Sequence, residues 1–121
     1  MSKDEEFVRS AWEHVIVCDG SYRHYAKGTV LLNWANHCFY EFNSFTAAAE
    51  FTRDHLEQVR CAEQNVFSLN EQIGTNIDIL LTMPDEIDAP FAVSIGEDLA
   101  RLGRIIEHEQ TALKSLKAGL K

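Results

Sequence analysis

The residues best suited to binding a metal ion gather in the first third of the chain. They are His14, Cys18, His24, His37 and Cys38. Adjacent residues of a strand point to opposite faces, so His37 and Cys38 cannot both bind one ion. No Cys-x-x-Cys, His-x-x-x-His or Glu-x-x-His spacing occurs in the sequence. We therefore expect no metal site and no cofactor, and we interpret Cys18 and Cys38 as small core residues.

Two other groups carry the residue types of acid–base catalysis. The string Glu107-His108-Glu109-Gln110 resembles a metalloprotease motif in its letters, but no second histidine lies four residues from His108. Asp54 and His55 are neighbours in a predicted helix, where successive side chains face different directions. The sequence therefore identifies no catalytic residue and favours a protein that is not an enzyme. A small enzyme whose site is assembled across the fold is the alternative.

Aromatic and basic side chains together predict a site for a small phosphorylated ligand. Tyr22, Arg23 and Tyr25 crowd one predicted strand, and Arg101 and Arg104 lie on the last predicted helix. Aromatic rings stack on bases, and the guanidinium fork holds phosphate oxygens. A pocket between sheet and helices, or across a dimer seam, would therefore bind a cyclic nucleotide signal. The alternative is that these arginines are ordinary surface groups paired with carboxylates such as Glu57, Glu97, Asp98 or Glu107.

The net charge of −8 is concentrated in one window of the chain. Residues 61–100 contain eight acidic side chains and no lysine or arginine. One interpretation is a solvated surface that keeps the protein in solution. The other is an acidic end that docks a basic protein partner, with Asp85, Glu86 and Asp88 as the partner-binding residues. Direct binding to duplex nucleic acid is disfavoured in both, because phosphates require clustered lysine and arginine.

The elements that carry these residues begin with a short helix and a sheet. Ser2 with Glu5 is a capping box that predicts a helix over residues 2–11. From Trp12 the pattern changes to the alternation of a strand, with a helix continuing to Val17 as the alternative. Short connections such as Asp19-Gly20 predict an antiparallel meander. It spans residues 12–42, with about four strands over residues 12–18, 22–27, 30–34 and 37–42.

A single long helix is predicted over residues 44–83. Ser44 provides its start and Pro84 its stop. Apolar residues recur along it at helical spacing, with His55 as the one polar member: Ala48, Phe51, Val59, Ala62, Val66, Leu69, Ile73, Ile77 and Leu80. About 38 residues would span ~57 Å, more than a compact chain of this length measures across. We therefore expect that the helix breaks near Gly74, that the protein is elongated, or that a second copy covers the excess length.

The rest of the chain is predicted to be an acidic loop over residues 84–93 and a second helix over residues 95–119. Ser94 with Glu97 forms a second capping box, and Gly119 is a stop. A heptad stripe runs along this helix, with Glu109 at the one position that is not apolar: Leu99, Leu102, Ile106, Leu113, Leu116 and Leu120. Glu109 lies either at the edge of the stripe or inside it as a buried group that fixes the register. The two long helices form an antiparallel helical hairpin. The first half of the long helix would cover the sheet with Phe45, Phe51 and Leu56, so the expected fold is α+β in a single domain, residues 1–121.

Composition narrows the class of protein further. No apolar run is long enough for a membrane helix, the acidic start of the chain lacks a secretory pattern, and three cysteines form no disulfide framework. We therefore expect a cytoplasmic protein that is not bound to a membrane. The helix length and the heptad stripe favour a homo-oligomer, a dimer or larger.

A small meander followed by a helical hairpin in an acidic chain resembles the layout of small phage proteins that block bacterial immunity. That resemblance implies either a grip on an effector protein or sequestration of a nucleotide signal, and it assigns no residue of this sequence to a site. We accordingly expect a non-enzymatic, oligomeric binding module, an inhibitor or adaptor that acts by occupying a partner. Sequestration of a small phosphorylated ligand in the arginine and aromatic pocket is the alternative.

Overall fold

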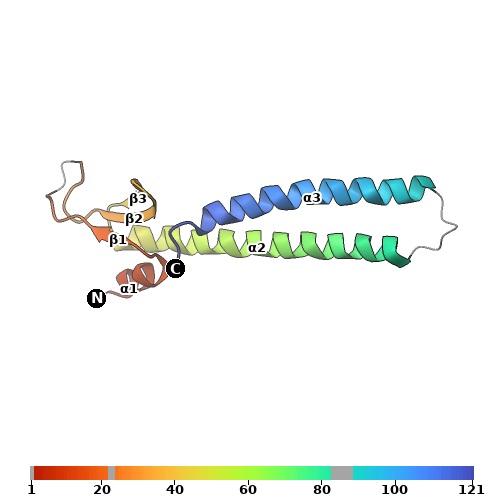
Figure 1. Cartoon of the computed structure of the whole chain (residues 1–121). Helices are drawn as coiled ribbons and strands as arrows, with labels where there is room; N and C mark the ends of the chain where they lie inside the picture. Colours follow the sequence, from red (N-terminus) through yellow and green to blue (C-terminus); the bar gives the residue numbers. More distant parts are fainter. Residues whose placement is uncertain (1, 22–23, 83–88) are drawn as a thin grey trace. The chain divides into compact units, whose positions relative to one another are not determined.

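The described part of the chain forms three helices and a three-stranded sheet. The computed structural model describes residues 2–21, 24–82 and 89–121. In chain order its elements are α1 (Lys3–Ala11), β1 (Val15–Val17), β2 (Val30–Ala35), β3 (Cys38–Phe42), α2 (Phe45–Thr82) and α3 (Ala89–Lys117), as labelled in Figure 1. An antiparallel sheet followed by long helices confirms the predicted α+β class.

The chain divides into two compact units, and each is described by itself. Unit 1 comprises residues 1–59 and 116–121, and unit 2 comprises residues 60–115. The expectation of a single domain therefore stays a prediction. Within the described ranges, none of the helices combines the length and the apolar character that a membrane crossing requires.

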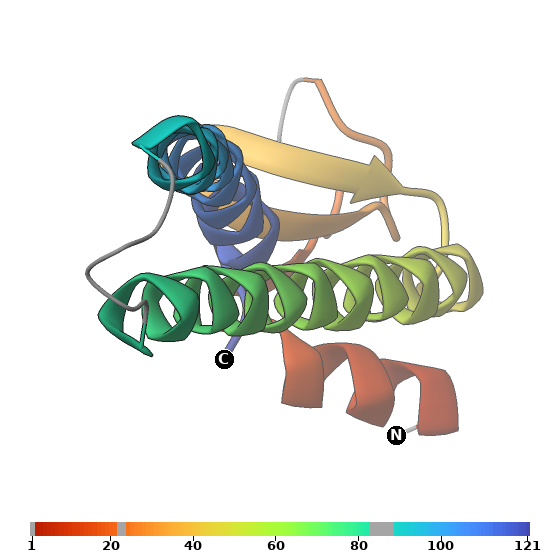
Figure 2. The same cartoon turned by 90° about the vertical axis from the view of Figure 1, so that its right-hand side faces the viewer.

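Unit 1 places α1 and the sheet on opposite sides of the first turns of α2 (Figure 2). One residue of α1, two of β2 and two of α2 form the centre of its core, all at most 1% exposed: Val8, Val30, Leu32, Ala48 and Ala49. The two alanines allow α2 to approach its neighbours closely. Phe45 and Phe51 pack against this core as expected, whereas Leu56 is 36% exposed.

The first helix ends where the strand pattern begins. The backbone N–H of Glu5 donates to Ser2 Oγ (3.1 Å), which caps α1 as the sequence predicts. The N–H of Trp12 closes the last turn on the carbonyl of Val8 (3.1 Å), and Trp12 itself has extended backbone angles. β1 follows at Val15, so the alternative of a helix continuing to Val17 is wrong.

The sheet has the strand order β1-β2-β3, with antiparallel neighbours. Ile16 pairs with Leu31, and Leu32 pairs with Tyr40. The strand predicted over residues 22–27 is not confirmed, because residues 24–27 form turns and bends and residues 22 and 23 lie outside the described residues. β1 therefore pairs directly with β2.

The long loop between β1 and β2 is closed by backbone hydrogen bonds at its base. The N–H of Cys18 donates to Thr29 O (2.9 Å), and the N–H of Gly28 donates to Cys18 O (2.7 Å). Gly28 has a φ of +91°, a conformation that glycine adopts without a steric penalty. The described residues of the predicted extra strand, 24–27, therefore carry turns and a bend and no strand.

The two long helices differ from the prediction in their bounds. α2 is continuous from Phe45 to Thr82, so the alternative of a break near Gly74 is wrong. α3 begins at Ala89, ahead of the capping box predicted at Ser94 and Glu97, which is therefore wrong. Pro90 falls in the first turn of α3, where the missing N–H leaves no helical hydrogen bond unmade. The predicted loop is accordingly shorter at its C-terminal end, and its residues 84–88 lie outside the described residues.

The last residues of the chain belong to unit 1 and hydrogen-bond to the junction between α1 and β1. Leu120 forms an antiparallel bridge with Trp12 and packs against the core. The N–H of Glu13 donates to Gly119 O (2.9 Å), and the N–H of Lys121 donates to Ala11 O (2.9 Å). Gly119 has a φ of +81° beyond the end of α3 at Lys117, so the predicted stop is confirmed.

Candidate functional site

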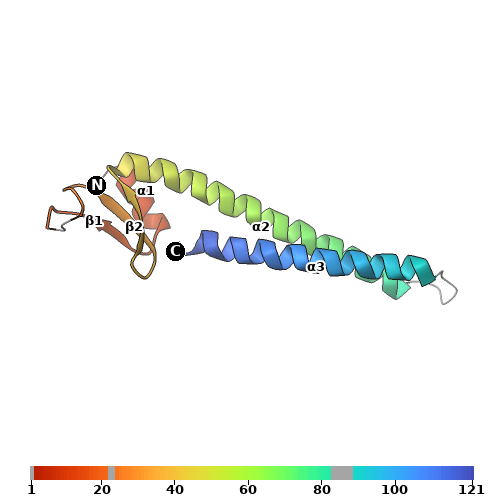
Figure 3. The same cartoon turned by 90° about the horizontal axis from the view of Figure 1, so that it is seen from above.

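A heptad repeat organises unit 2, in which α2 and α3 run antiparallel (Figure 1, Figure 3). Within unit 2, the buried or partly buried positions on α2 are Ala62, Val66, Leu69, Ile73, Asn76 and Leu80, and those on α3 are Ala92, Ile95, Leu99, Leu102, Gly103, Ile106, Glu109 and Leu113. The described part of unit 2 contains only these two helices. The apolar stripe of each helix is therefore buried against the other helix. The stripe keeps a 3.5-residue period. It therefore reaches Asn76 rather than the predicted Ile77, which is 43% exposed.

One flank of unit 2 is polar and hollowed, and we call it the polar flank. A hollow of about 470 Å³ is lined by Ser68, Glu71, Gln72, Thr75, Asn76, Asp98, Arg101 and Leu102. A hollow of about 220 Å³ is lined by Asn65, Ser68, Leu69, Gln72, Ile105 and Glu109. Glu109 is partly buried and shares the smaller hollow with the amides of Asn65 and Gln72. Glu109 therefore occupies a stripe position that is only partly buried, and both positions considered from the sequence stay predictions.

Arg101, one of the predicted ligand residues, lines the larger hollow of the polar flank. Its Nη2 lies 3.5 Å from Asp98 Oδ1, in an exposed ion pair of the kind that contributes little to stability. Hydroxyl and amide side chains of Ser68, Gln72 and Thr75 line the same hollow. A guanidinium with such donors can hold a phosphate or carboxylate group. Arg104 is not among the residues that line this hollow.

The other predicted site residues belong to unit 1 or lie outside the described residues. Tyr25 is partly buried in the loop between β1 and β2. Burial raises the pKa of its hydroxyl, and a hydrogen bond to Glu41 raises it further. At the start of the same loop, hydrogen bonds from Ser21 lower the pKa of the Asp19 carboxyl.

Several predicted residues therefore remain untested. Tyr22 and Arg23 lie outside the described residues, as do the acidic residues Asp85, Glu86 and Asp88. Tyr25 belongs to unit 1, whereas Arg101 and Arg104 belong to unit 2. A ligand pocket shared between the sheet and the second helix thus stays a prediction.

Unit 1 contains a groove that the sequence did not predict. It has a volume of about 570 Å³ and is lined by Arg9, Trp12, Glu13, His14, Val15, Ile16, Asn33, Phe39 and Lys121. That volume falls in the range of small-molecule sites. The only advance signal was the clustering of charged and polar residues where the first helix gives way to a strand.

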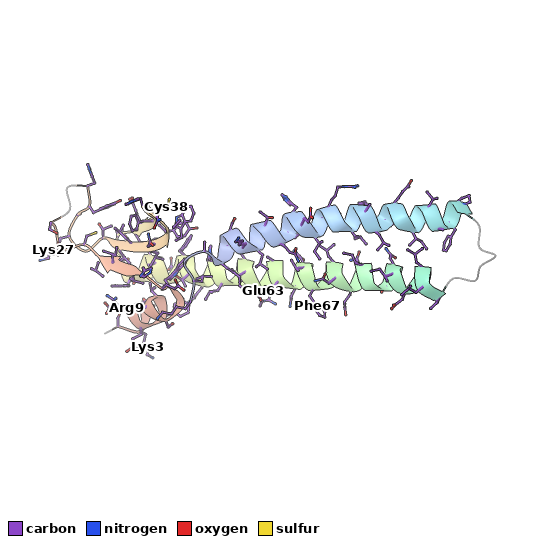
Figure 4. The ribbon with its side chains drawn as sticks, viewed as in Figure 1. Lys3, Arg9, Lys27, Cys38, Glu63 and Phe67 are labelled. Atoms are coloured by element: carbon purple, nitrogen blue, oxygen red, sulfur yellow. The ribbon has the colours of Figure 1, made fainter. Side chains whose placement is uncertain are left out.

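Two polar side chains of this groove, Arg9 and Asn33, make contacts within the protein. Arg9, labelled in Figure 4, lies with Nη2 3.4 Å from Glu5 Oε1 and with its guanidinium carbon 5.7 Å from the centre of the Phe45 ring. Its buried Nε has no hydrogen-bond partner within the described ranges. Asn33 donates both side-chain hydrogen bonds, to Ala35 O (2.7 Å) and Cys38 O (3.1 Å). The amide N–H groups of Asn33 are thus engaged within the protein, whereas Arg9 keeps a buried N–H group that no described residue accepts.

The histidines and cysteines have separate structural environments. In the part of the chain that the structure describes, no group of three or more His, Cys, Asp or Glu side chains could hold a metal ion. Cys18 is 1% exposed, as a core residue, while Cys61 is exposed. His55 is 5% exposed, with Nε2 2.5 Å from the carbonyl oxygen of Leu116 and its ring 5.3 Å from that of Trp12. Because a carbonyl only accepts, Nε2 donates, and His55 is a satisfied core group.

The fold and these surfaces define the class of protein as an α+β chain with a small antiparallel sheet followed by long helices that carry a polar, hollowed flank. No protein-family model, curated protein or solved structure matches the chain. The surfaces of the two units are therefore the basis for proposing a function.

Proposed function

We propose that the chain is a cytoplasmic, non-enzymatic and oligomeric binding module, an inhibitor or adaptor that acts by occupying a protein partner through unit 2. One observation carries this proposal. Among the described residues, ten large hydrophobic side chains are exposed, and seven of them lie in unit 2: Phe67, Ile77, Ile79, Leu81, Phe91, Val93 and Ile105. Exposed apolar side chains that gather in one region mark interaction surfaces.

The form of unit 2 supports a role in docking. A two-helix unit buries a single stripe of each helix, so the remaining surface of both helices stays accessible. Rows of side chains on helices are held at fixed spacing, which suits recognition of another helix or of a groove. The acidic residues of this part of the chain favour a basic partner and would make the association sensitive to salt.

Affinity capture with matched variants tests the proposal. Phe67→Lys and Ile105→Lys each place a charge at an exposed position of unit 2, and Val17→Lys does the same in unit 1. We expect the wild type and Val17→Lys to capture the same partner and at least one unit 2 variant to lose it. Capture that survives both unit 2 substitutions, or that fails equally with Val17→Lys, would contradict the proposal.

A second candidate function is sequestration of a small phosphorylated ligand such as a cyclic nucleotide. The observation in its favour is that Arg101 lines a hollow of about 470 Å³ together with hydroxyl and amide side chains. A ligand that binds only the folded chain raises the melting temperature in a thermal-shift screen of nucleotides. Arg101→Gln should abolish that shift, and Arg104→Gln should preserve it because Arg104 does not line the hollow. Mass spectrometry of the same mixtures would distinguish capture from turnover.

A further inference from the structure

Over residues 67–81 of α2 and 93–103 of α3, the flank of unit 2 opposite the polar flank carries no charged side chain, whereas earlier on α2 and later on α3 the same side carries Arg60, Glu63, Glu107 and Lys114. Within these bounds the residues on that side of the heptad stripe are Phe67, Asn70, Gly74, Ile77 and Leu81 of α2, and Val93, Gly96, Ala100 and Gly103 of α3. We call this surface the uncharged flank. Its large side chains are well exposed, at 65% for Phe67, 43% for Ile77, 77% for Leu81 and 59% for Val93.

Large side chains on one helix of this flank lie beside small residues on the other. In the polar flank, Thr75 shares a hollow with Asp98, and Ser68 shares one with Ile105. Because residues 65–76 of α2 share these hollows with residues 98–109 of α3, the later residues of α2 lie toward the earlier residues of α3 in this antiparallel pair. The flank therefore has a ridge of bulky groups along α2, and on α3 it has Val93 followed by a strip of low relief from Gly96 to Gly103.

The glycines of the uncharged flank are not required by packing within the chain. A Cβ added at Gly74, Gly96 or Gly103 would meet no atom within 4 Å. None of the three has a positive φ, so none is needed for a turn. Glycine inside a helix is less favourable than alanine, and its usual compensation is the close approach of another backbone. The open space above these residues is where such a backbone would lie.

We propose that the uncharged flank docks a second copy of this chain, with α2 of each copy against α3 of the other in a four-helix bundle. The ridge on α2 and the low strip on α3 make the surface complementary to itself, which a two-fold interface requires. Without charges, the flank buries no ion when it closes on its own copy. The inference rests on the proposed function, in which unit 2 is the docking element.

The area of the flank agrees with a dimer. Its four exposed apolar side chains present on the order of 400 Å². Two such patches, together with the helix surface around Gly96 and Gly103, approach roughly 1,000 Å², the lower bound for a specific interface.

Sedimentation of the full chain from micromolar to millimolar concentration tests this proposal. We expect a monomer–dimer equilibrium for the wild type. Ile77→Lys should raise the dissociation constant by about tenfold or more. Ile79→Lys is the matched control, because Ile79 lies on the same helix with 39% exposure but on the side of the polar flank. A wild type that stays monomeric throughout, or equal effects of the two substitutions, would overturn the proposal.

A second variant separates docking from folding. Gly96→Ala combined with Gly103→Ala should raise the melting temperature of the dilute chain, because alanine favours a helix and its Cβ has room within the chain. The same methyl groups should hold the two backbones apart and raise the dissociation constant of the dimer. An unchanged dissociation constant would show that the backbones do not approach at these glycines.

The outcomes also separate this inference from the proposed function. A monomeric chain that still captures a protein partner through unit 2 would remove the self-docking proposal alone. A dimer that depends on Ile77 but captures no partner in any variant would remove the inhibitor or adaptor function and leave self-docking in place.

Discussion

At the residue scale, Trp12 links several elements of unit 1, because its indole contacts residues of both β3 and α2. Its indole is 1% exposed and lies 5.8 Å from the ring of Tyr40 and 6.3 Å from that of Phe51. Indole Nε1 donates to Thr52 Oγ1 (2.9 Å), and the Thr52 hydroxyl donates to the carbonyl of Ala48 (2.7 Å). Both buried polar side chains are thereby satisfied, which is the condition for burying them at low cost.

Thr52→Val tests this relay, because valine keeps the shape and removes the hydroxyl. The indole N–H would be left buried without an acceptor, so we expect the free energy of unfolding to fall by about 1–3 kcal/mol. Thr75→Val is the matched control on the same helix, since the exposed Thr75 hydroxyl also donates to the carbonyl four residues earlier, Glu71 O (3.0 Å). It should change stability by less than about 0.5 kcal/mol. Urea unfolding gives the free energy of unfolding of both variants. Equal losses in the two variants would contradict a stabilising role for the hydrogen bond from Trp12 to Thr52.

Tyr25 provides a test at alkaline pH. Burial and the hydrogen bond to Glu41 raise the pKa of its hydroxyl, so the protonated form is favoured in the folded chain. The stabilisation is complete below the pKa of the unfolded chain and is lost as pH rises through the folded pKa. Glu41→Gln removes the negative charge and should lower the midpoint of Tyr25. The midpoint of the Tyr25 titration is measured from the absorbance of tyrosinate, after subtraction of the Tyr25→Phe variant. An unchanged midpoint in Glu41→Gln would refute the role of Glu41.

At the element scale, two glycines that the sequence suggested as points where a helix stops or breaks have opposite structural roles. Gly119 has a φ of +81°, and an added Cβ would lie 2.6 Å from Asn33 O. Gly74 lies inside α2 with open space around it. The first glycine therefore fixes the C-terminal segment against β2, and the second only reduces helix propensity within its own chain.

Paired alanine substitutions distinguish these roles. Gly119→Ala should lower the free energy of unfolding by about 2 kcal/mol or more, from backbone strain and the clash with Asn33. Gly74→Ala should raise it by up to ~1 kcal/mol when measured on the dilute chain. Thermal unfolding followed by circular dichroism is sufficient. Equal effects of the two changes would mean that the C-terminal segment does not pack on β2 as described.

At the scale of the whole molecule, burial is unevenly divided between the two units. Side chains that are at most 1% exposed all belong to unit 1 among the described residues, whereas the most buried positions of unit 2 include Leu102 at 6% and Ile95 at 7%. Helix stability in proteins comes mainly from packing of the apolar face. Unit 2 therefore has less of the packing that protects backbone amides from opening.

Hydrogen exchange read out by mass spectrometry should show this difference. In the dilute chain, we expect amides of β2 and the first turns of α2 to exchange slowest, and amides of unit 2 to exchange faster. Raising the protein concentration should slow exchange in unit 2 if the uncharged flank self-associates. Uniform protection of both units would indicate a single cooperative structure and contradict the expectation.

Local patterns predicted those parts of the chain whose geometry depends on near neighbours. The Ser2 cap, the stop at Gly119 and the start of α2 after Ser44 follow from hydrogen bonds and φ angles within a few residues. The strand predicted over residues 22–27 is not confirmed, because the described residues 24–27, despite their strand propensity, precede a base that is closed by backbone hydrogen bonds of Cys18 and Gly28. Arg101 was identified from its type, but its hollow required two helices in a particular register.

The sequence by itself determined the α+β class, with a small antiparallel sheet before long helices, and most of the apolar positions of those helices, because periodicity records which face of each element avoids water. Only the tertiary structure decided that α2 stays continuous through Gly74, because a glycine in a helical pattern is compatible with either a break or a continuous helix. It also decided that the stripe passes through Asn76 and leaves Ile77 on the surface. The pairing of Leu120 with Trp12 likewise joins residues far apart in the chain, and such non-local contacts depend on the packing of the whole of unit 1.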